Sequence, residues 1–249
     1  MLTTRQVKLQ RSISGFSILE MAIVMMIVSI MLGGLLVSIA STQEVNNRTE
    51  TQNQLDEIVD ALYGFAQVNG YLPCPATPTS NGLEARTAGA CSRVHGFVPS
   101  ATLGLSGGVN TDGLLVDSWL GAYRYSVTNT NGNAFTNQIG LRASIAALAT
   151  TMGALTPNLQ VCDAAACGTA IASGLPAVVL SLGADWAEFD ALDVDASENS
   201  GEATLNGYDI PADLDFVSAA YIEDTFDDLI TWIAPSILFT KMITAGQLP

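Results

Sequence analysis

The apolar residues divide the chain into an unbroken N-terminal run and a long remainder in which they are interspersed with polar ones. The run covers residues 16–39 and contains a single charged side chain, Glu20. A helix of this length is about 36 Å long, which is sufficient for the roughly 30 Å hydrocarbon core of a bilayer. The pattern therefore predicts a transmembrane helix over residues 16–39.

A different apolar pattern follows this run. Between residues 55 and 66, apolar side chains recur at three- and four-residue steps, with acidic residues on the other faces. The stripe comprises Leu55, Ile58, Val59, Leu62, Phe65 and Ala66. Such spacing is typical of a helix with one buried face, and Asn69-Gly70 is a stop signal. We therefore expect one helix over residues 16–68, apolar all round in its first half and amphipathic in its second.

The rest of the chain predicts a β-rich body. Residues 71–113 are rich in Gly, Pro, Ser and Thr, as irregular loops are. Residues 119–127 and 177–182 are rich in aromatic and β-branched side chains, which predicts strands, and Asn129–Asn133 predicts a turn. Residues 138–152 are compatible with a strand followed by a helix, but their pattern does not decide their secondary structure.

The last apolar stretch, residues 226–243, raises the question of a second membrane span. Asp227, Asp228, Pro235 and Lys241 interrupt it. We therefore expect a packed C-terminal helical segment here. Together these patterns predict an α+β fold, with a long N-terminal helix on an antiparallel β-sheet head that carries irregular, disulfide-bearing loops.

The charge distribution limits the classes of partner. The formal net charge is −15, with 24 acidic residues against nine basic ones. Fourteen of the acids lie between Asp185 and Asp228, and no Lys or Arg occurs from residue 143 to 240. A nucleic acid or an anionic surface would repel such a body, so nucleic acid is not an expected partner. Three basic residues precede the apolar run without any acid, which predicts a cytoplasmic N-terminus and an exported body.

The four cysteines predict either disulfides or a metal site. Four residues, Cys74, Cys91, Cys162 and Cys167, allow three pairings, and the simplest joins sequence neighbours, the first with the second and the third with the fourth. Export would favour disulfides over free thiols. A zinc site is disfavoured, because paired short spacings are lacking and His95 is the only histidine.

The possible interpretations of the apolar run differ in whether they explain the presence of Glu20. A secretory signal peptide has a shorter apolar core followed by a small-residue cleavage site, which is lacking here. An ordinary signal anchor explains the run but not its acid. A carboxylate inside a membrane span costs several kcal/mol unless it meets a partner, so Glu20 indicates a functional site.

The Gly15-Phe16 junction, with Glu20 four residues later and a basic segment before it, resembles the prepilin pattern of the type IV filament superfamily. The resemblance implies that a prepilin peptidase and methyltransferase cuts after Gly15 and methylates Phe16. It implies that Glu20 of one subunit neutralises the new amine of its neighbour during filament assembly. The corresponding domains are a leader over 1–15, a spine helix over 16–70 and a periplasmic or extracellular head over 71–249.

Two segments of the head resemble the major pseudopilins of type II secretion systems. One is Asp117-x-Trp119-x-x-x-Tyr123-x-Tyr125, and the other is Ser-Leu-Gly-Ala-Asp over residues 181–185. In that family the second segment begins a loop that binds calcium. Residues 71–116 and 205–249 have no counterpart in the compact pseudopilin pattern, so a pilus subunit fits as well as a secretion pseudopilin.

The acid-rich loop supplies oxygen ligands of the kind that calcium prefers. The candidates are Asp185, Asp190, Asp193, Asp195, Glu198 and Asn199. Their spacing does not match the EF-hand, which requires Gly where Glu198 stands. The alternative is a solvated acidic face, so calcium is a hypothesis here and no other cofactor is expected.

The expected function is that of a structural filament subunit, not an enzyme. The segment Gly104–Gly108 fits the G-x-S-x-G pattern of serine hydrolases, but no histidine follows it. The expected partners are identical and related pilin subunits, the peptidase, the membrane and an inner-membrane assembly platform. The subunit would wait in a bacterial inner membrane and then enter a periplasmic or surface filament. The alternative is a single-pass, membrane-anchored periplasmic binding protein that does not polymerise.

Overall fold

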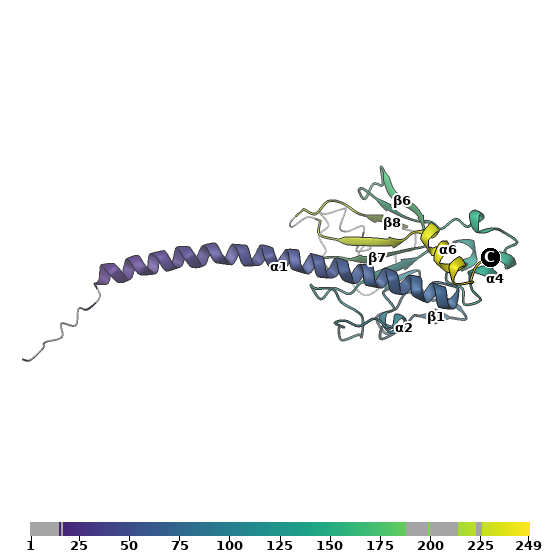
Figure 1. Ribbon diagram of the computed structural model, residues 1–249, viewed down its shortest axis with the longest axis horizontal. Coiled ribbons are helices and arrows are strands. Elements are labelled where there is room, and N and C mark those ends of the chain that lie inside the picture. The colour runs from purple at the N-terminus through teal and green to yellow at the C-terminus, as the bar shows by residue number, and fades with distance from the viewer. Residues whose placement is uncertain (1–14, 16, 188–198, 200–213, 223–225) are drawn as a thin grey trace, which may run out of the picture. The chain divides into compact units, whose positions relative to one another are not determined.

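The structure is a computed structural model that describes residues 15, 17–187, 199, 214–222 and 226–249; of residues 32–41 it describes the backbone alone. The chain divides into two compact units, Met1–Asn46 and Asn47–Pro249. One helix, α1 (Ile18–Asn69), contributes its first part to one unit and its second part to the other (Figure 1). The predicted long helix is confirmed, with its end within one residue of the expected position.

The main sheet of the second unit has four antiparallel strands in the order β3-β4-β7-β9. These are β3 (His95–Phe97), β4 (Arg124–Val127), β7 (Ala177–Ser181) and β9 (Leu229–Ile233). The two central strands, β4 and β7, are almost wholly buried, as expected of strands covered on both faces. The structure is therefore α+β, with the second part of α1 packed against an antiparallel sheet.

The other strands described in the second unit form two smaller sheets. One has the order β6-β5-β8 and consists of β5 (Leu159–Cys162), β6 (Ala170–Leu175) and β8 (Asp215–Val217). In it β5 pairs antiparallel with β6 and parallel with β8. The other is a short ribbon of β1 (Arg86–Thr87) and β2 (Ala90–Cys91).

Short helices connect the strands. They are α2 (Ser100–Leu103), α3 (Thr130–Asn133), α4 (Leu141–Ala147), the 3₁₀ helix η1 (Met152–Ala154) and α6 (Pro235–Thr244). In α3, three consecutive residues have positive φ, so the segment Asn129–Asn133 is a tight turn, as predicted. The undecided region 138–152 contains α4 and no strand.

Four of the six residues in the predicted apolar stripe of α1 are buried, and the other two are half-buried. Leu55, Ile58, Leu62 and Ala66 are fully inaccessible and belong to the principal core cluster, which also contains the two tyrosines of the β4 region. Burying a Leu or Ile side chain contributes about 1.5–3 kcal/mol. This stripe is therefore a major source of the attachment between the second part of α1 and the sheet.

The end of α1 is fixed by two local features. Gly70 adopts a φ of +80°, a conformation that glycine reaches without the strain of a Cβ atom. The side chain of Gln247 then donates hydrogen bonds from Nε2 to the main-chain carbonyls of Gln67 (3.1 Å) and Val68 (2.9 Å). The predicted stop at Asn69-Gly70 is thereby confirmed.

Two predicted segments need correction. Of residues 119–127, only Arg124–Val127 form a strand, because the side chain of Asp117 holds the preceding residues in a turn. Of residues 226–243, Leu229–Ile233 form strand β9 and not helix. Their aromatic and β-branched side chains suit a strand beside β7, and Pro235 begins α6 with a φ already suited to a helix. The strand at 177–182 is confirmed as β7.

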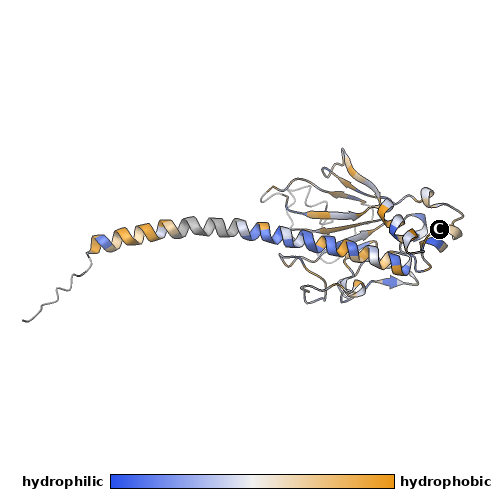
Figure 2. Cartoon of the chain, viewed as in Figure 1, coloured by the Kyte–Doolittle hydropathy of each residue, from blue (hydrophilic) through white to orange (hydrophobic). Residues whose placement is uncertain are grey.

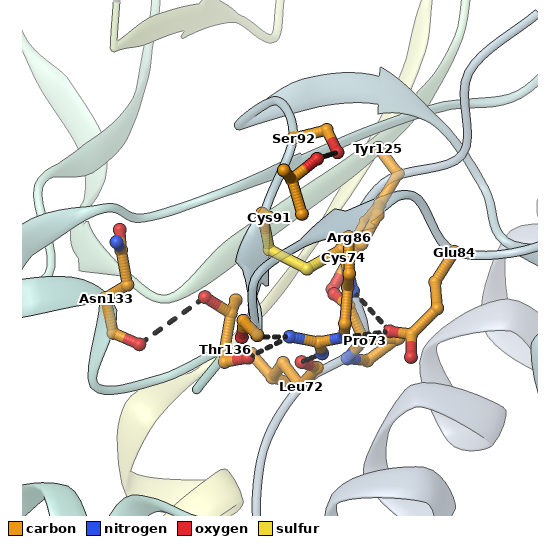
Figure 3. Close-up of a disulfide and its surroundings, with 12 residues drawn as sticks. Leu72, Pro73, Cys74, Glu84, Arg86, Cys91, Ser92, Tyr125, Asn133 and Thr136 are labelled. Carbon is orange, nitrogen blue, oxygen red and sulfur yellow. Dashed lines mark hydrogen bonds and ion pairs between the residues drawn. A yellow bond between two sulfur atoms is a disulfide. The ribbon is translucent and has the colours of Figure 1, made fainter. Parts of the chain in front are cut away.

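The sequence-local disulfide pairing is confirmed. Cys74 pairs with Cys91 and Cys162 with Cys167, with Cα–Cα distances of 5.2 Å and 5.0 Å. The first disulfide joins the segment after α1 to strand β2 (Figure 3). The region 71–113 is otherwise irregular, as expected, although it also supplies strand β3.

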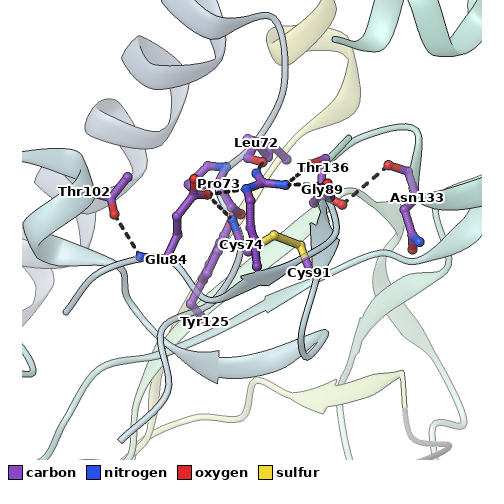
Figure 4. Close-up of polar contacts among 11 residues, drawn as sticks. Leu72, Pro73, Cys74, Glu84, Gly89, Cys91, Thr102, Tyr125, Asn133 and Thr136 are labelled. Carbon is purple, nitrogen blue, oxygen red and sulfur yellow. Dashed lines mark hydrogen bonds and ion pairs between the residues drawn. A yellow bond between two sulfur atoms is a disulfide. The ribbon is translucent and has the colours of Figure 1, made fainter. Parts of the chain in front are cut away.

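An ion pair stabilises the loops around this disulfide. Arg86 Nε lies 2.9 Å from Glu84 Oε2, and the same carboxylate oxygen accepts the main-chain N–H of Cys74 (Figure 4). The guanidinium also donates to the carbonyls of Thr136 and Leu72. Because the guanidinium of Arg86 contacts three separate positions, Glu84, Thr136 and Leu72, these loops are held together by polar contacts as well as by the disulfide.

Candidate functional site

The proposed processing region lies at the start of α1. Gly15 is exposed and precedes the helix, and Glu20 lies in its first turn with an exposed side chain. Phe16, expected to become the first mature residue, and the residues before Gly15 are outside the part of the chain that the structure describes. The expected partner of Glu20, the amine of Phe16 on a neighbouring subunit, is therefore not among the described residues.

The first turns of α1 expose apolar side chains on all sides. Figure 2 shows that the described turns before residue 32 are predominantly hydrophobic. Between Ile18 and Met31, eleven large apolar side chains are at least 42% exposed. They are Ile18, Leu19, Met21, Ile23, Val24, Met25, Met26, Ile27, Val28, Ile30 and Met31. A helix that is apolar all round is stable only when lipid or other protein surrounds it.

The membrane span expected over residues 16–39 falls partly outside the described side chains, which omit Phe16 and residues 32–41. Within the part of the chain that the structure describes, no helix has both the length and the hydropathy of a membrane crossing.

A second site lies at one end of the main sheet. Strand pairing places Ser181, the last residue of β7, opposite Leu229, the first of β9. The turn after β7 therefore lies beside the segment before β9, and carboxylate oxygens of Asp185, Asp227 and Asp228 lie within 4.8 Å of one another. Oxygens around one calcium ion lie about 2.3–2.6 Å from it, so two ligands are at most about 5 Å apart. The three carboxylates have the spacing of a shared ion.

Asp227 is the best-defined member of this acidic cluster of Asp185, Asp227 and Asp228. Its side chain is only 8% exposed, and its Oδ2 accepts the main-chain N–H of Ala184. Among the residues that the structure describes, no hydrogen-bond donor reaches its buried Oδ1. A buried carboxylate oxygen without a partner is costly, and a cation coordinated there would remove that cost.

The charges of the cluster also favour a cation. Asp227 and Asp228 are adjacent and both buried, at 8% and 6% exposure. Two carboxylates within 4.8 Å repel each other by roughly 3 kcal/mol at an effective dielectric constant of about 20. The sequence has no Lys or Arg from residue 143 to residue 240, the stretch that contains all three acids. Carboxylate ligands in this geometry suit a hard divalent ion such as calcium. Such an ion would neutralise the charges of the cluster and would supply no redox chemistry.

Only part of the sequence-derived calcium set belongs to this cluster. Asp185 is a member, and Asn199 lies next to it, because Asn199 Nδ2 donates to Asp228 Oδ2 at 2.6 Å and to the carbonyl of Val217 at 2.8 Å. The amide of Asn199 thus orients Asp228 and joins it to β8. The other expected ligands, Asp190, Asp193, Asp195 and Glu198, lie outside the described residues.

Asp227 and Asp228 were not predicted as ligands. The sequence presented them only as interruptions of the apolar run 226–243. Two adjacent acids directly before a largely apolar strand were the available signal, because buried acids require a partner once the strand is placed in a sheet. Their proximity to Asp185 depends on the pairing of β7 with β9, which the sequence pattern did not indicate.

The Asp117 turn adjoins this site. Asp117 is 4% exposed; its Oδ1 accepts the N–H groups of Trp119 (2.9 Å) and Gly121 (2.8 Å), and its Oδ2 accepts the hydroxyl of Ser181. Burial raises the pKa of Asp117 above its usual value, although these hydrogen bonds oppose the shift. The Asp117–Ser181 bond ties this turn to the end of β7.

The same turn also contacts the residue after Asp185. Trp186 Nε1 donates to the carbonyl of Trp119 at 3.0 Å. A Cβ atom on Gly121 would lie 2.8 Å from Cγ of Trp186, so the close approach requires glycine. The two segments that resembled pseudopilin motifs, 117–125 and 181–185, are therefore in direct contact.

One basic side chain of α1 reaches the acidic cluster. Arg48 Nη1 donates to the main-chain carbonyl of Asp227 at 3.0 Å, and the guanidinium carbon lies 4.1 Å from the ring centroid of Tyr221. Both residues belong to the second unit. The hydrogen bond leaves the carboxylate of Asp227 available to a cation.

The remaining candidate residues have structural contacts. Cys162 and Cys167 lie near Asp215, but the two sulfurs are joined in a disulfide and are not thiolate ligands. His95 is buried in β3, with Nδ1 2.9 Å from Ser126 Oγ on the neighbouring strand. Gly104, which begins the G-x-S-x-G segment, is the left-handed residue that ends α2.

No family model, curated protein or solved structure matches this chain.

Proposed function

We propose that this chain is a structural subunit of a type IV pilin-like filament. The observation that carries the proposal is the exposure of apolar side chains on every side of α1 between Ile18 and Met31, with one acid, Glu20, among them. Such a surface is satisfied by lipid before assembly and by the same segment of other subunits afterwards. One helix can therefore serve first as an anchor and then as the cohesive part of a fibre.

Glu20 and the Gly15-Phe16 junction supply the specificity of this assembly. Cleavage after Gly15 would create an ammonium group on Phe16, in apolar surroundings. A carboxylate from a neighbouring subunit would neutralise it, and leaving either charge unpaired would cost about 3–5 kcal/mol. Because only one axial offset brings the two groups together, the pair would set the register between subunits.

The second unit supports a location outside the cytoplasm. It contains two disulfides, which form and persist in oxidising compartments. Its acidic character, with fourteen acids between Asp185 and Asp228, favours solubility of the exposed body. The unit would form the head of each subunit, on the periplasmic or outer side.

Mass spectrometry of the N-terminus of the protein purified from membranes tests the proposal. The expected result is a chain that begins at a methylated Phe16. Chemical cross-linking of the same membranes is expected to give a ladder of oligomers. A functional, monomeric chain that retains residues 1–15 would contradict the proposal and favour the single-pass anchored binding protein.

A further inference from the structure

We propose that the edge of strand β6 formed by Ala170–Ser173 pairs antiparallel with the same edge of a second copy of this chain. The observation that carries the proposal is an exposed, uncharged sheet edge on a chain whose net charge is −15. The inference goes beyond the proposed function and does not depend on it, because every residue concerned lies within the second unit.

Strand β6 is the terminal strand of its sheet. In the order β6-β5-β8, one side of β6 pairs with β5, and its other side meets no strand among the residues that the structure describes. Figure 1 shows β6 at the outer border of the second unit. A terminal strand has main-chain N–H and C=O groups along its outer side, and these can pair with a strand of another chain.

The strand is both accessible and held in place. Ala170, Ile171 and Ser173 are exposed, with Ile171 at 51%. Leu175 is buried in a core cluster that also contains residues of β5, β7 and β8, and Ala172 packs against this cluster. Because the core already holds β6 in position, a partner strand would bind without first having to order it.

Strand β6 lacks the side chains that usually prevent edge pairing. Natural edge strands often carry a charged residue or Pro, and the six residues of β6 include neither. Two features limit the length of the edge: register shifts interrupt its pairing with β5, and Gly174 has a φ of +65°. The part that can accept another strand is therefore Ala170–Ser173.

The charge distribution favours a second copy as the partner. From residue 143 to residue 184, Asp163 is the only charged side chain. Two copies of so acidic a chain repel each other wherever their acidic surfaces meet, so they approach most easily through this neutral segment. A basic partner would instead be drawn to the acids between Asp185 and Asp228. The neutral edge thus suits a neutral strand, and β6 of another copy is such a strand.

The small side chains of β6 suit pairing with itself. Ala170, Ala172 and Ser173 leave room for a second backbone at the roughly 4.8 Å spacing of paired strands. Antiparallel pairing is slightly more stable per residue than parallel pairing, and it places the two turns that carry Asp163 at opposite ends. In this arrangement Ala170 of one copy lies opposite Ser173 of the other, and Ile171 lies close to its own counterpart.

The size and symmetry of this contact indicate where it would act. One pair of short strands is a small interface beside the roughly 1,200 Å² or more that stable complexes bury. The contact therefore needs a high local concentration, such as that of chains sharing one membrane. Its two-fold symmetry also differs from the screw symmetry of successive subunits in a filament, so in assembled material it would join heads of neighbouring rows.

Photo-cross-linking of the full chain in detergent tests the pairing. Benzoylphenylalanine replaces Ala170; side chains stand perpendicular to a sheet, so the probe leaves the main-chain edge free. Ordinary and ¹⁵N-labelled chains are mixed in equal amounts, so that cross-links between copies are recognised by their mixed mass. The expected product joins position 170 of one copy to the segment around Ser173 of the other, with a yield that rises with protein concentration.

Charge variants at Ile171 provide the specific control. Ile171→Glu should lower the yield at least about tenfold, because two carboxylates meet across the pair. Ile139→Glu is the matched control, since Ile139 is a similarly exposed isoleucine, at 59%, outside β6, and it should keep the parental yield. Mixing Ile171→Glu chains with Ile171→Lys chains should restore the product, which a mere loss of folding would not allow.

The remaining outcomes contradict the inference. A chain that gives no cross-link between copies through β6 at any concentration overturns the pairing, as does a probe at position 170 that reaches a different segment of the second copy. An undiminished yield in Ile171→Glu shows that the edge is not the contact. Cross-linking in cell membranes to another protein, and not to a second copy, overturns the choice of partner.

Discussion

Gly183 and Asp227 are in contact in a way that excludes any side chain at position 183. A Cβ atom there would overlap the carboxylate of Asp227, and Gly183 has a φ of +67°, which L-residues rarely adopt. The turn after β7 therefore needs glycine both for its backbone conformation and for the approach of the acid. This contact joins the two strands that bring the acidic cluster together.

Gly183→Ala should lower the free energy of unfolding by at least about 2 kcal/mol, since it adds backbone strain to a steric overlap. It should also remove any calcium response, because Asp227 must move. Gly153→Ala is the matched control, as a Cβ atom at Gly153 meets nothing within 4 Å. Chemical denaturation of both variants checks the prediction, and equal stabilities would refute it.

Glu20→Val should leave membrane insertion and leader cleavage intact but impair assembly. The substitution removes the acid that would neutralise the Phe16 ammonium of a neighbour, at a cost of about 3–5 kcal/mol per contact. Assembled material, measured in sheared or cross-linked fractions, should fall at least tenfold, and Glu20→Asp should retain more of it. Incorporation of the valine variant at the parental level would show that Glu20 does not set the register.

The two disulfides should differ in their contribution to stability. Cys74–Cys91 spans 17 positions and Cys162–Cys167 only five. From loop-closure entropy, replacing the first pair with alanine should cost about 3 kcal/mol and replacing the second about 2 kcal/mol. Unfolding curves of the two double variants measure the difference. A larger loss for the second pair would mean that loop entropy does not govern these disulfides.

Leu62→Ala should destabilise the head unit by about 2–5 kcal/mol, because Leu62 is fully buried in the stripe of α1 and its removal leaves a cavity. Val68, on the same helix, is 76% exposed, so Val68→Ala should change stability by no more than about 0.5 kcal/mol. Thermal unfolding of the two variants provides the comparison. Similar melting temperatures would show that the stripe is not the main attachment of α1.

The features that the sequence predicted correctly are those encoded by local patterns. The stripe from Leu55 to Ala66 repeats with the period of a helix, and Asn69-Gly70 is a stop signal that acts within one turn. The segment 177–182 became β7 because a short run of β-branched residues suits a buried strand. None of these predictions required knowledge of which segments meet in space.

The features that the sequence did not predict depend on contacts between distant segments. Residues 229–233 form a strand because they pair with β7, although their apolar run continues into α6 and resembles one helix. Asp227 became part of a site through the same pairing. Residues 119–123 have strand-like composition, but Asp117 captures their N–H groups and forms a turn.

Arg48 bears on how tightly an ion could be held. It brings a positive charge to the main-chain carbonyl of Asp227, so it offsets part of the negative potential that attracts a cation. Fewer net charges around a site weaken calcium binding, and extracellular modules work at dissociation constants of about 10⁻⁴–10⁻³ M. The site would then fill or empty with the calcium content of the surrounding medium.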